Sequence, residues 1–271
     1  MKEFFKYNSN GNDFVILNNL DHSLNFIAKN PKRIQKLCVR EFSIGSDGLI
    51  LLQRSNLADF KMKIFNSDGS EADMCGNGLL SLVKFLSDFI DKRNEILIET
   101  KAGIYKTFID EKKISFRSKL PKILKENMKI SVDGSIYDLQ MLNSGVLHGI
   151  IFIKDIEKID VFRLGKKIRF LKEFEPSGIN VNFCEVIDRD KIKVRVYEKG
   201  VENETLCCST GALAISYSHF LKNKRKSIKN LLLQYRGGEI KTNLEKDEIT
   251  LTSKPTFAFR GYVDSIGNND F

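Results

Sequence analysis

The chain has 271 residues, of which 42% are hydrophobic, and 44 lysines and arginines against 35 aspartates and glutamates give a net charge of +9. This length and mix suit a soluble globular protein with one large domain or two of about 130 residues. The 4 prolines and 18 glycines exclude a collagen-like or proline-rich chain, and no apolar run approaches the roughly 18 residues that a membrane span needs.

The first half of the chain is typical of many short strands and few helices. Runs rich in β-branched and aromatic residues, bounded by turn residues, predict strands at 13–18, 49–53, 60–66, 95–100, 104–109 and 114–117. A hairpin turn is expected at 110–113. Asn30 followed by Pro31 predicts an N-cap and a first helical position, and therefore a helix that runs to about Glu41.

The second half repeats this style. Strands are predicted at 137–142, 149–153, 180–187, 191–197, 231–235, 240–242, 249–252 and 256–263, with turns at 237–238 and 245–247. The basic residues are scattered, and their densest cluster, at 222–226, is typical of the solvated end of a helix.

Two longer helices are predicted, from about residue 76 to 91 and from about 209 to 221. Both are apolar over more than one stripe, which is typical of helices that are buried on all sides. A cysteine precedes each helix, and Cys75-Gly-Asn-Gly78 parallels Cys208-Ser-Thr-Gly211 about half a chain later. We interpret the match as a diverged duplication, which predicts two similar α/β halves, each a curved sheet around one central helix. A chance match of four residues is the alternative.

A thiol at a helix N-terminus lies beside free N–H groups and the positive end of the helix dipole, and both favour the thiolate. The same N–H groups can bind a carboxylate. If the two helix starts face each other, one thiolate can remove the α-proton of an amino acid while the other thiol protonates the opposite face. Two features would assist this inversion. One is the exclusion of water from the site, and the other is a set of N–H donors directed at the developing negative charge.

The remaining cysteines and the termini indicate a cytoplasmic protein. The five cysteines are odd in number and form no C-x-x-C motif, which is typical of reduced thiols. No signal-peptide core follows the first lysine. Cys38 and Cys184 are expected to be buried and inert. No metal-ligand spacing and no cofactor motif is present, so neither a metal nor a cofactor is expected, although a pyridoxal lysine stays open from the residues alone.

The chain resembles the diaminopimelate epimerase family from residue 4 to about residue 263. The segments that carry the resemblance are 11–15, 44–49, 64–71, 74–78, 99–103, 179–183, 197–206 and 208–211. The resemblance implies a pyridoxal-independent conversion of LL- to meso-diaminopimelate on the route to lysine and peptidoglycan. It also implies an α/β (α+β) fold of two pseudo-symmetric, mostly antiparallel domains, 1–119 and 120–261, with the active site between them and the tail 262–271 packed on the first.

The resemblance also implies roles for individual residues. Cys75 and Cys208 would be the acid/base pair, and His148 and Glu198 would tune their pKa values. The residues that would hold the α-carboxylate are Gly76, Asn77, Ser209 and Thr210. The residues that would grip the amino groups and the distal carboxylate are Asn12, Asn66, Asn180, Glu198 and Lys199.

Several of these residues have ordinary structural alternatives. Asn12 and Asn66 lie beside turn-like stretches, where asparagine is common for backbone reasons. Thr210 could cap its helix. His148 could be a hydrogen-bonded core histidine, and Glu198 could be a solvent-exposed strand end.

The chain also departs from the family pattern. Lys199 replaces the usual arginine and so loses a bidentate fork for the distal carboxylate, which predicts weaker binding. Val146 and Leu80 replace polar residues, and Ser209 replaces a glycine. Cys207 adds an oxidation site, and Cys208 rather than Cys207 is assigned to catalysis because it keeps the Cys-x-x-Gly spacing.

Two other functions stay open at this point. The altered residues at the distal end would also fit a pyridoxal-independent racemase of another amino acid. The net charge would fit a basic nucleic-acid-binding protein, but no basic stripe with interleaved aromatic residues is present. A small amino acid is the expected partner, without nucleic acid or membrane, and a homodimer is left open.

Overall fold

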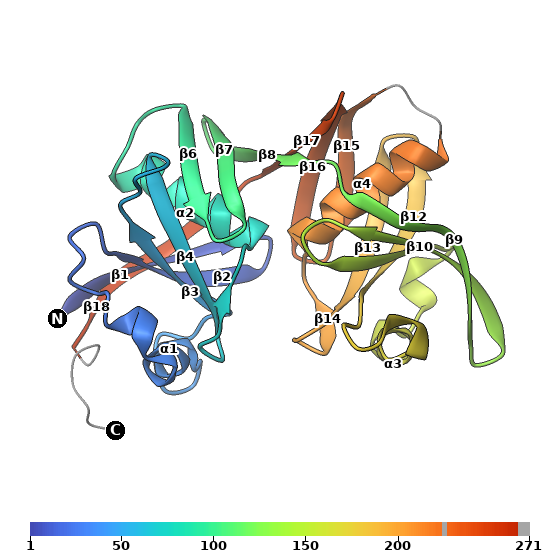
Figure 1. Cartoon of the computed structure of the whole chain (residues 1–271), viewed down its shortest axis with the longest axis horizontal. Helices are drawn as coiled ribbons and strands as arrows, with labels where there is room; N and C mark the ends of the chain where they lie inside the picture. The colour runs from blue at the N-terminus through green and yellow to red at the C-terminus, as the bar shows by residue number, and fades with distance from the viewer. Residues whose placement is uncertain (224–226, 265–271) are drawn as a thin grey trace. The chain divides into compact units, whose positions relative to one another are not determined.

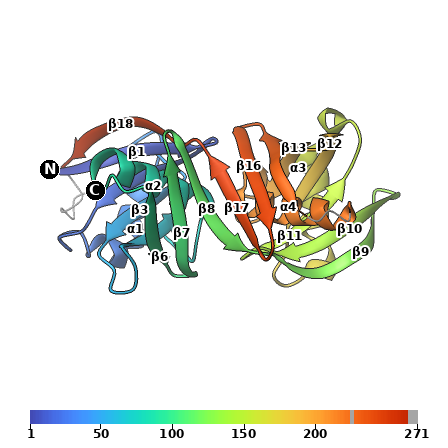
Figure 2. The same ribbon diagram turned by 90° about the horizontal axis from the view of Figure 1, so that it is seen from above.

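The computed structural model describes residues 1–223 and 227–264 (Figure 1). It divides the chain into two compact units, Met1–Phe116 with the residues from Ser253 onward, and Arg117–Thr252. The boundaries expected from the sequence were 119 and 261. The return to the first unit comes earlier because β18 (Thr256–Val263) pairs antiparallel with β1 (Lys2–Ser9), as Figure 2 shows. Of the expected tail, residues 265–271 lie outside the described residues.

The first unit contains one sheet in the order β18-β1-β2-β3-β4-β6-β7-β8. Its further strands are β2 (Asn12–Asn18), β3 (Gly48–Gln53), β4 (Phe60–Asn66), β6 (Glu95–Thr100), β7 (Gly103–Asp110) and β8 (Lys113–Lys119). The short β5 (Glu71–Ala72) pairs with β4. The pairs β2–β3 and β4–β6 are parallel, and the other pairs are antiparallel.

The second unit has the order β9-β10-β11-β12-β13-β15-β16-β17. Its strands are β9 (Lys122–Val132), β10 (Ser135–Asn143), β11 (Leu147–Phe152), β12 (Asn180–Asp188), β13 (Lys191–Glu198), β15 (Ile228–Tyr235), β16 (Gly238–Glu245) and β17 (Glu248–Ser253). The short β14 (Asn203–Thr205) pairs with β13. The parallel pairs are β11–β12 and β13–β15.

The two units therefore repeat one topology, which confirms the prediction of two similar halves. The parallel pairs fall at the same two places in each strand order. A short helix follows the third strand of each strand order, α1 (Pro31–Cys38) after β2 in one unit and α3 (Val161–Arg169) after β11 in the other. A longer helix follows β5 and β14, α2 (Gly76–Phe89) and α4 (Ser209–Lys222) respectively. These two helices are the ones that the cysteine motifs predicted.

Each long helix is enclosed by the sheet of its own unit (Figure 1). Helix α2 contacts β1, β2, β3, β4, β7 and β18, and α4 contacts β10, β11, β12, β15 and β16. The first eleven residues of α2 include ten buried ones, which explains why its apolar surface is wider than one stripe. The short helices cover the other face of each sheet: Ile34 and Leu37 of α1 pack with Leu49 and Leu51 of β3.

Candidate active site

The first cysteine of the matching pair lies at the start of α2. Cys75 is the N-cap, and the Gly78 N–H group donates to its Sγ atom at 3.5 Å. The Sγ atom lies 3.8 Å from the Oδ1 atom of Asn12, and the Asn77 Nδ2 atom donates to the same oxygen at 3.4 Å. The Cys75 side chain is partly exposed, so a small molecule can reach it.

Asp47 determines which way the Asn12 amide points. Its Oδ2 atom accepts hydrogen bonds from Asn12 Nδ2 at 2.9 Å and from the Asp13 N–H group at 3.0 Å. Arg40 forms an ion pair with the other oxygen of Asp47 at 2.7 Å. A carboxylate only accepts hydrogen bonds, so the Asn12 amino group must face Asp47 and its carbonyl oxygen must face Cys75. No role was expected for Asp47 from the sequence, although it lies in the matching segment 44–49.

Asn66 lies at the end of β4, opposite Gly48 of β3, which follows Asp47 in the chain. Its Nδ2 atom donates to the Ser70 Oγ atom at 3.0 Å, in the turn that follows the strand, and its side chain is exposed. This arrangement matches the structural alternative given for Asn66, and its binding role stays a prediction.

The second cysteine of the pair lies at the start of α4. Cys208 is the N-cap, and its Sγ atom lies 3.4 Å from the Thr210 Oγ1 atom. The Tyr235 hydroxyl donates to the Cys208 carbonyl oxygen at 3.2 Å. Thr210 is thus not the capping residue, because its hydroxyl lies between Cys208 and His148, whose Nε2 atom is 3.1 Å away.

His148 is fully buried in the second unit. Its Nδ1 atom lies 3.1 Å from the Nδ2 atom of Asn182 on the neighbouring strand β12. Burial lowers the pKa of His148 from 6.5 to about 3, so the ring is neutral at ordinary pH. His148 is thus a buried, hydrogen-bonded histidine, as the structural alternative expected. It also contacts Thr210, whose hydroxyl in turn contacts Cys208.

The three other residues expected at this site lie at the adjoining ends of β12 and β13. Asn180 Oδ1 accepts from the Lys199 N–H group at 2.8 Å, and the Thr205 hydroxyl donates to Glu198 Oε2 at 2.7 Å. Lys199 Nζ donates to the Ser177 carbonyl oxygen at 2.8 Å. Glu198 is only partly exposed, so the solvent-exposed alternative for it does not hold.

The glycine of each motif is closely packed against the sheet. A Cβ atom on Gly78 would lie 2.4 Å from the Cδ1 atom of Ile64, and one on Gly211 would lie 2.6 Å from the Oδ1 atom of Asn182. Both distances are shorter than van der Waals contact. The Cys-x-x-Gly spacing thus brings each cysteine-capped helix against the sheet that encloses it.

The remaining cysteines agree with the expected inert role. Cys38 and Cys184 are buried, and burial raises the pKa of both thiols. None of the five cysteines, all of which lie in the described part of the chain, forms a disulfide. Across residues 1–223 and 227–264, no group of three or more His, Cys, Asp or Glu side chains could hold a metal ion, and no helix is long and apolar enough to cross a membrane.

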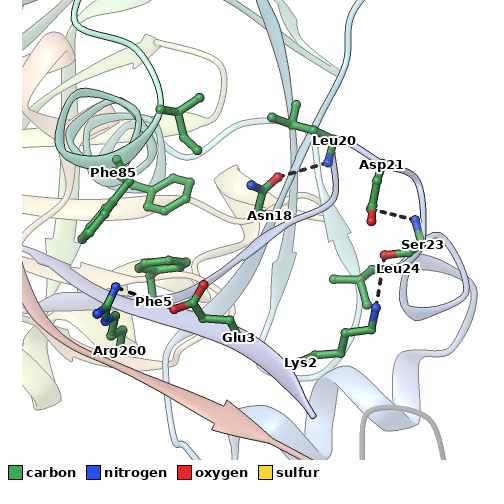
Figure 3. Close-up of a pocket in the computed structure, with 12 residues that line it drawn as sticks. Lys2, Glu3, Phe5, Asn18, Leu20, Asp21, Ser23, Leu24, Phe85 and Arg260 are labelled. Carbon is green, nitrogen blue, oxygen red and sulfur yellow. Dashed lines mark hydrogen bonds and ion pairs between the residues drawn. The ribbon is translucent and has the colours of Figure 1, made fainter.

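A pocket of about 490 Å³ in the first unit lies away from the cysteine. It is lined by the C-terminal half of α2, including Phe85 and Phe89, and by Phe5, Lys2 and Arg260 of the neighbouring strands (Figure 3). Cys75 is at the other end of this 14-residue helix, which is about 21 Å long at 1.5 Å per residue. The pocket is therefore separate from the candidate site.

Comparison with solved structures gives the class of fold. A hydroxyproline epimerase from Agrobacterium vitis superposes with a TM-score of 0.73 at 14% identity, covering 96% of this chain and 91% of that chain. A phenazine biosynthesis protein of the PhzF family from Enterococcus faecalis superposes with a TM-score of 0.71 at 14% identity, covering 97% and 99%. The chain thus has the mixed α/β fold of this class of proteins.

Sequence comparison gives the family. The family model described as diaminopimelate epimerase matches residues 4–118 and 140–257. The diaminopimelate epimerase of Aquifex aeolicus (strain VF5) is 38% identical over 272 residues, covering 96% of each chain. That of Prochlorococcus marinus (strain NATL2A) is 41% identical over 234 residues, covering 78% of this chain and 81% of the relative. The chain belongs to the diaminopimelate epimerase family and is an isomerase, which confirms the resemblance inferred from its sequence.

Proposed function

We propose that the protein epimerises LL-diaminopimelate to meso-diaminopimelate in the cytoplasm, with Cys75 and Cys208 as the two proton-transfer groups and without pyridoxal. Family membership supports the substrate and the reaction. The observation that carries the assignment of the two residues is their equivalent position, since each cysteine is the N-cap of the enclosed helix of its repeat.

The N-terminal N–H groups of the two helices supply the binding site for the α-carboxylate. They belong to Gly76, Asn77, Ser209 and Thr210. Such groups carry partial positive charge and have no partners within the helix, so they bind anions. Hydrogen bonds to the carboxylate also lower the cost of removing the adjacent α-proton, because negative charge spreads onto those oxygens in the transition state.

The proton transfers balance without another reactant. One cysteine is a thiolate and takes the α-proton, while the other is a thiol and gives its proton to the opposite face of the same carbon. After one turnover the protonation states of the two cysteines are exchanged, and water restores them. The proposal requires both thiols to act on one α-carbon, and it assigns Glu198 and His148 to control of the thiols.

The distal amino and carboxylate groups are assigned to Asn12, Asn66, Asn180, Glu198 and Lys199. Lys199 has one donor engaged by the Ser177 carbonyl oxygen. An ammonium group carries three donors, so two are left for the distal carboxylate. A point charge of this kind orients a carboxylate less strictly than an arginine fork does, and this favours a racemase of another amino acid as the second candidate.

The test is solvent exchange in D₂O with the purified full-length chain and no added pyridoxal. We expect deuterium at the α-carbon of diaminopimelate together with interconversion of the LL and meso isomers on chiral chromatography. A panel of other amino acids is run in parallel. Exchange into one of these but not into diaminopimelate would move the assignment to the second candidate, and exchange into none would reject both.

A further inference from the structure

We propose that Asn182 is a positioning residue for Cys208: its amide sets the tautomer of His148, and the Thr210 hydroxyl then donates a hydrogen bond to the cysteine sulfur. The inference deepens the proposed function and rests on it for the catalytic role of Cys208. All four side chains belong to the second unit.

The orientation of the Asn182 amide follows from its surroundings. Its Nδ2 atom lies 3.1 Å from the Gly149 carbonyl oxygen, 3.4 Å from the Asn180 carbonyl oxygen and 3.1 Å from His148 Nδ1. The side chain is fully buried, and its Oδ1 atom has no hydrogen-bond partner among the described residues. The reverse orientation would place Oδ1 against two carbonyl oxygens, so the amino group must face them.

This orientation determines where the proton of His148 lies. An amide nitrogen donates hydrogen bonds and does not accept them, so His148 Nδ1 must be the unprotonated acceptor. A neutral imidazole carries one proton, which is therefore on Nε2. The Nε2–H group then donates to Thr210 Oγ1, 3.1 Å away. Burial of the ring, which disfavours the imidazolium ion, supports the neutral form.

The Thr210 hydroxyl completes the relay. Its oxygen accepts from His148, so its own proton is left for another acceptor. The Cys208 sulfur, at 3.4 Å, is the only other partner of this hydroxyl among the described residues. A hydrogen bond from a donor to the sulfur stabilises the thiolate relative to the thiol. This series of hydrogen bonds, from Asn182 through His148 and Thr210 to Cys208, therefore favours Cys208 as the proton acceptor.

Other ionisable groups surround this relay and are kept constant in the test. Tyr235, which donates to the Cys208 carbonyl oxygen, lies in the electrostatic range of Cys184, Cys207, Cys208 and Glu198. None of the substitutions below removes any of these groups. Thr210→Val and Thr210→Ser also add no charge, so an altered reactivity at Cys208 in these variants reports on the relay.

The first measurement needs no substrate, and the tautomer is read in the unaltered chain. A long-range ¹H–¹⁵N spectrum of the ¹⁵N-labelled full chain at neutral pH shows which ring nitrogen of His148 carries the proton, and His148→Gln identifies the signal. We expect the proton on Nε2. A proton on Nδ1, or on both nitrogens, would overturn the inference. Because no substrate is present, this result does not depend on whether diaminopimelate is the right amino acid.

The second measurement uses Asn182→Asp, whose carboxylate, when ionised, can only accept hydrogen bonds. The proton of His148 is expected to move to Nδ1, so that Nε2 takes the Thr210 proton and the sulfur loses its donor. We expect kcat to fall about tenfold to a hundredfold, as for loss of a hydrogen bond to a charged group, with KM changed less than about threefold. Thr242→Val, which removes another fully buried hydrogen bond of this unit, is the control and should change neither tautomer nor kcat.

The Thr210 pair keeps the inference testable if Asn182→Asp does not fold. Thr210→Val should lower kcat as much as Asn182→Asp, and Thr210→Ser should restore it to within about threefold of the parent. The double variant should be no slower than either single one, because both remove the same hydrogen bond. Unchanged kcat in folded Thr210→Val, or fully additive losses, would refute the relay.

Discussion

The two cysteine-capped helices occupy equivalent places in the repeated topology, but their neighbours differ in polarity. In the first unit the parallel pair β2–β3 begins with Phe14 opposite Gly48, and two residues later comes Ile50. In the second unit β11–β12 begins with His148 opposite Asn180, and two residues later comes Asn182. Phe14 and Ile50 of one repeat thus correspond to His148 and Asn182 of the other.

This difference means that the two thiols face opposite kinds of hydrogen-bonding group. The side chain that Cys75 faces is Asn12, whose carbonyl oxygen accepts and favours the protonated thiol, while the Gly78 N–H group also donates to the sulfur. Cys208 faces a hydroxyl that has its lone pair engaged by His148, and so favours the thiolate. Both units have the helix N-terminus and the glycine, but the side chains around the sulfur differ, with an accepting oxygen near Cys75 and the Thr210 hydroxyl near Cys208.

The largest expected effect comes from removing either thiol. Cys75→Ala and Cys208→Ala should each lower the rate of full inversion by roughly a thousandfold, because a positioned acid or base contributes about 10²- to 10⁴-fold. Chiral chromatography of the product gives the rate. Cys207→Ala is the matched control and should stay active. Full activity in either of the first two variants would reject the two-base mechanism, and loss in Cys207→Ala alone would move the role to Cys207.

The two motif glycines offer a sharper comparison of the repeats. Alanine at Gly211 would press on the Oδ1 atom of Asn182, whose amino group lies within 3.4 Å of three acceptors. Alanine at Gly78 would press on the terminal methyl group of Ile64. We expect Gly211→Ala to lower kcat about tenfold to a hundredfold. Gly78→Ala should leave kcat within about threefold and cost about 1–3 kcal/mol of stability by overpacking. Steady-state kinetics measures kcat and urea unfolding measures the stability of both variants. An equal loss of kcat in Gly211→Ala and Gly78→Ala would contradict the predicted difference between the two sites.

The buried histidine should give the chain a dependence of stability on pH that its counterpart Phe14 cannot give. The pKa of His148 is about 3 in the fold and 6.5 ordinarily, so between these values the unfolded chain binds a proton that the folded chain does not. The free energy of unfolding should fall as the pH is lowered through this window, by up to about 1.4 kcal/mol per pH unit. Urea unfolding of His148→Gln should show a smaller slope between pH 6.5 and 4, and an unchanged slope would contradict the burial argument.

The smallest expected effect lies on the Cys75 side. Asp47→Asn removes the carboxylate that orients Asn12 and allows the Asn12 amide to turn its amino group toward the sulfur. Loss of one neutral hydrogen bond predicts a two- to tenfold decrease in kcat. Asp59→Asn, at a carboxylate that pairs with Arg93 in the same unit, is the control for loss of a surface charge. A change in kcat equal to that of the control would remove Asp47 from the site.

The starts of the two central helices were predictable because their signals are local. The cysteine cap and the glycine lie within one helical turn of each other, and the predicted starts at 76 and 209 agree with α2 and α4. Asn30 also caps α1 as predicted, by accepting from the Arg33 N–H group, although α1 ends at Cys38 rather than near Glu41. The turns predicted at 110–113 and 245–247 also rest on adjacent residues, and both connect consecutive strands of the structure.

Elements without a clear apolar pattern were missed. Strand β9 has 11 residues, most of them exposed or half-buried, so it lacks the alternation that predicts a strand. Helix α3 buries only Val161, Gly165 and Ile168 among basic residues. The pairing of β18 with β1 joins the two ends of the described chain, and no local pattern carries that information.

The two cysteines that we propose as the acid/base pair could be selected from the sequence, but their orienting neighbours could not. Asn182 and Asp47 act on side chains that are remote in the chain, such as His148 and Asn12, and only the fold brings these together. One signal was available, since Asn182 is a polar residue within the apolar-rich run 179–187, and a buried amide in such a run needs partners.

The pairing of β18 with β1 has a consequence for how the chain is made. The second unit is one continuous stretch, Arg117–Thr252, whereas the first is assembled from two stretches on either side of it. During synthesis the second unit can therefore finish folding first, while β1 waits with an open edge until β18 leaves the ribosome. An unpaired edge strand is a template for pairing with other chains, so a product that stops before Thr256 would expose the first unit to aggregation while the second unit is already complete.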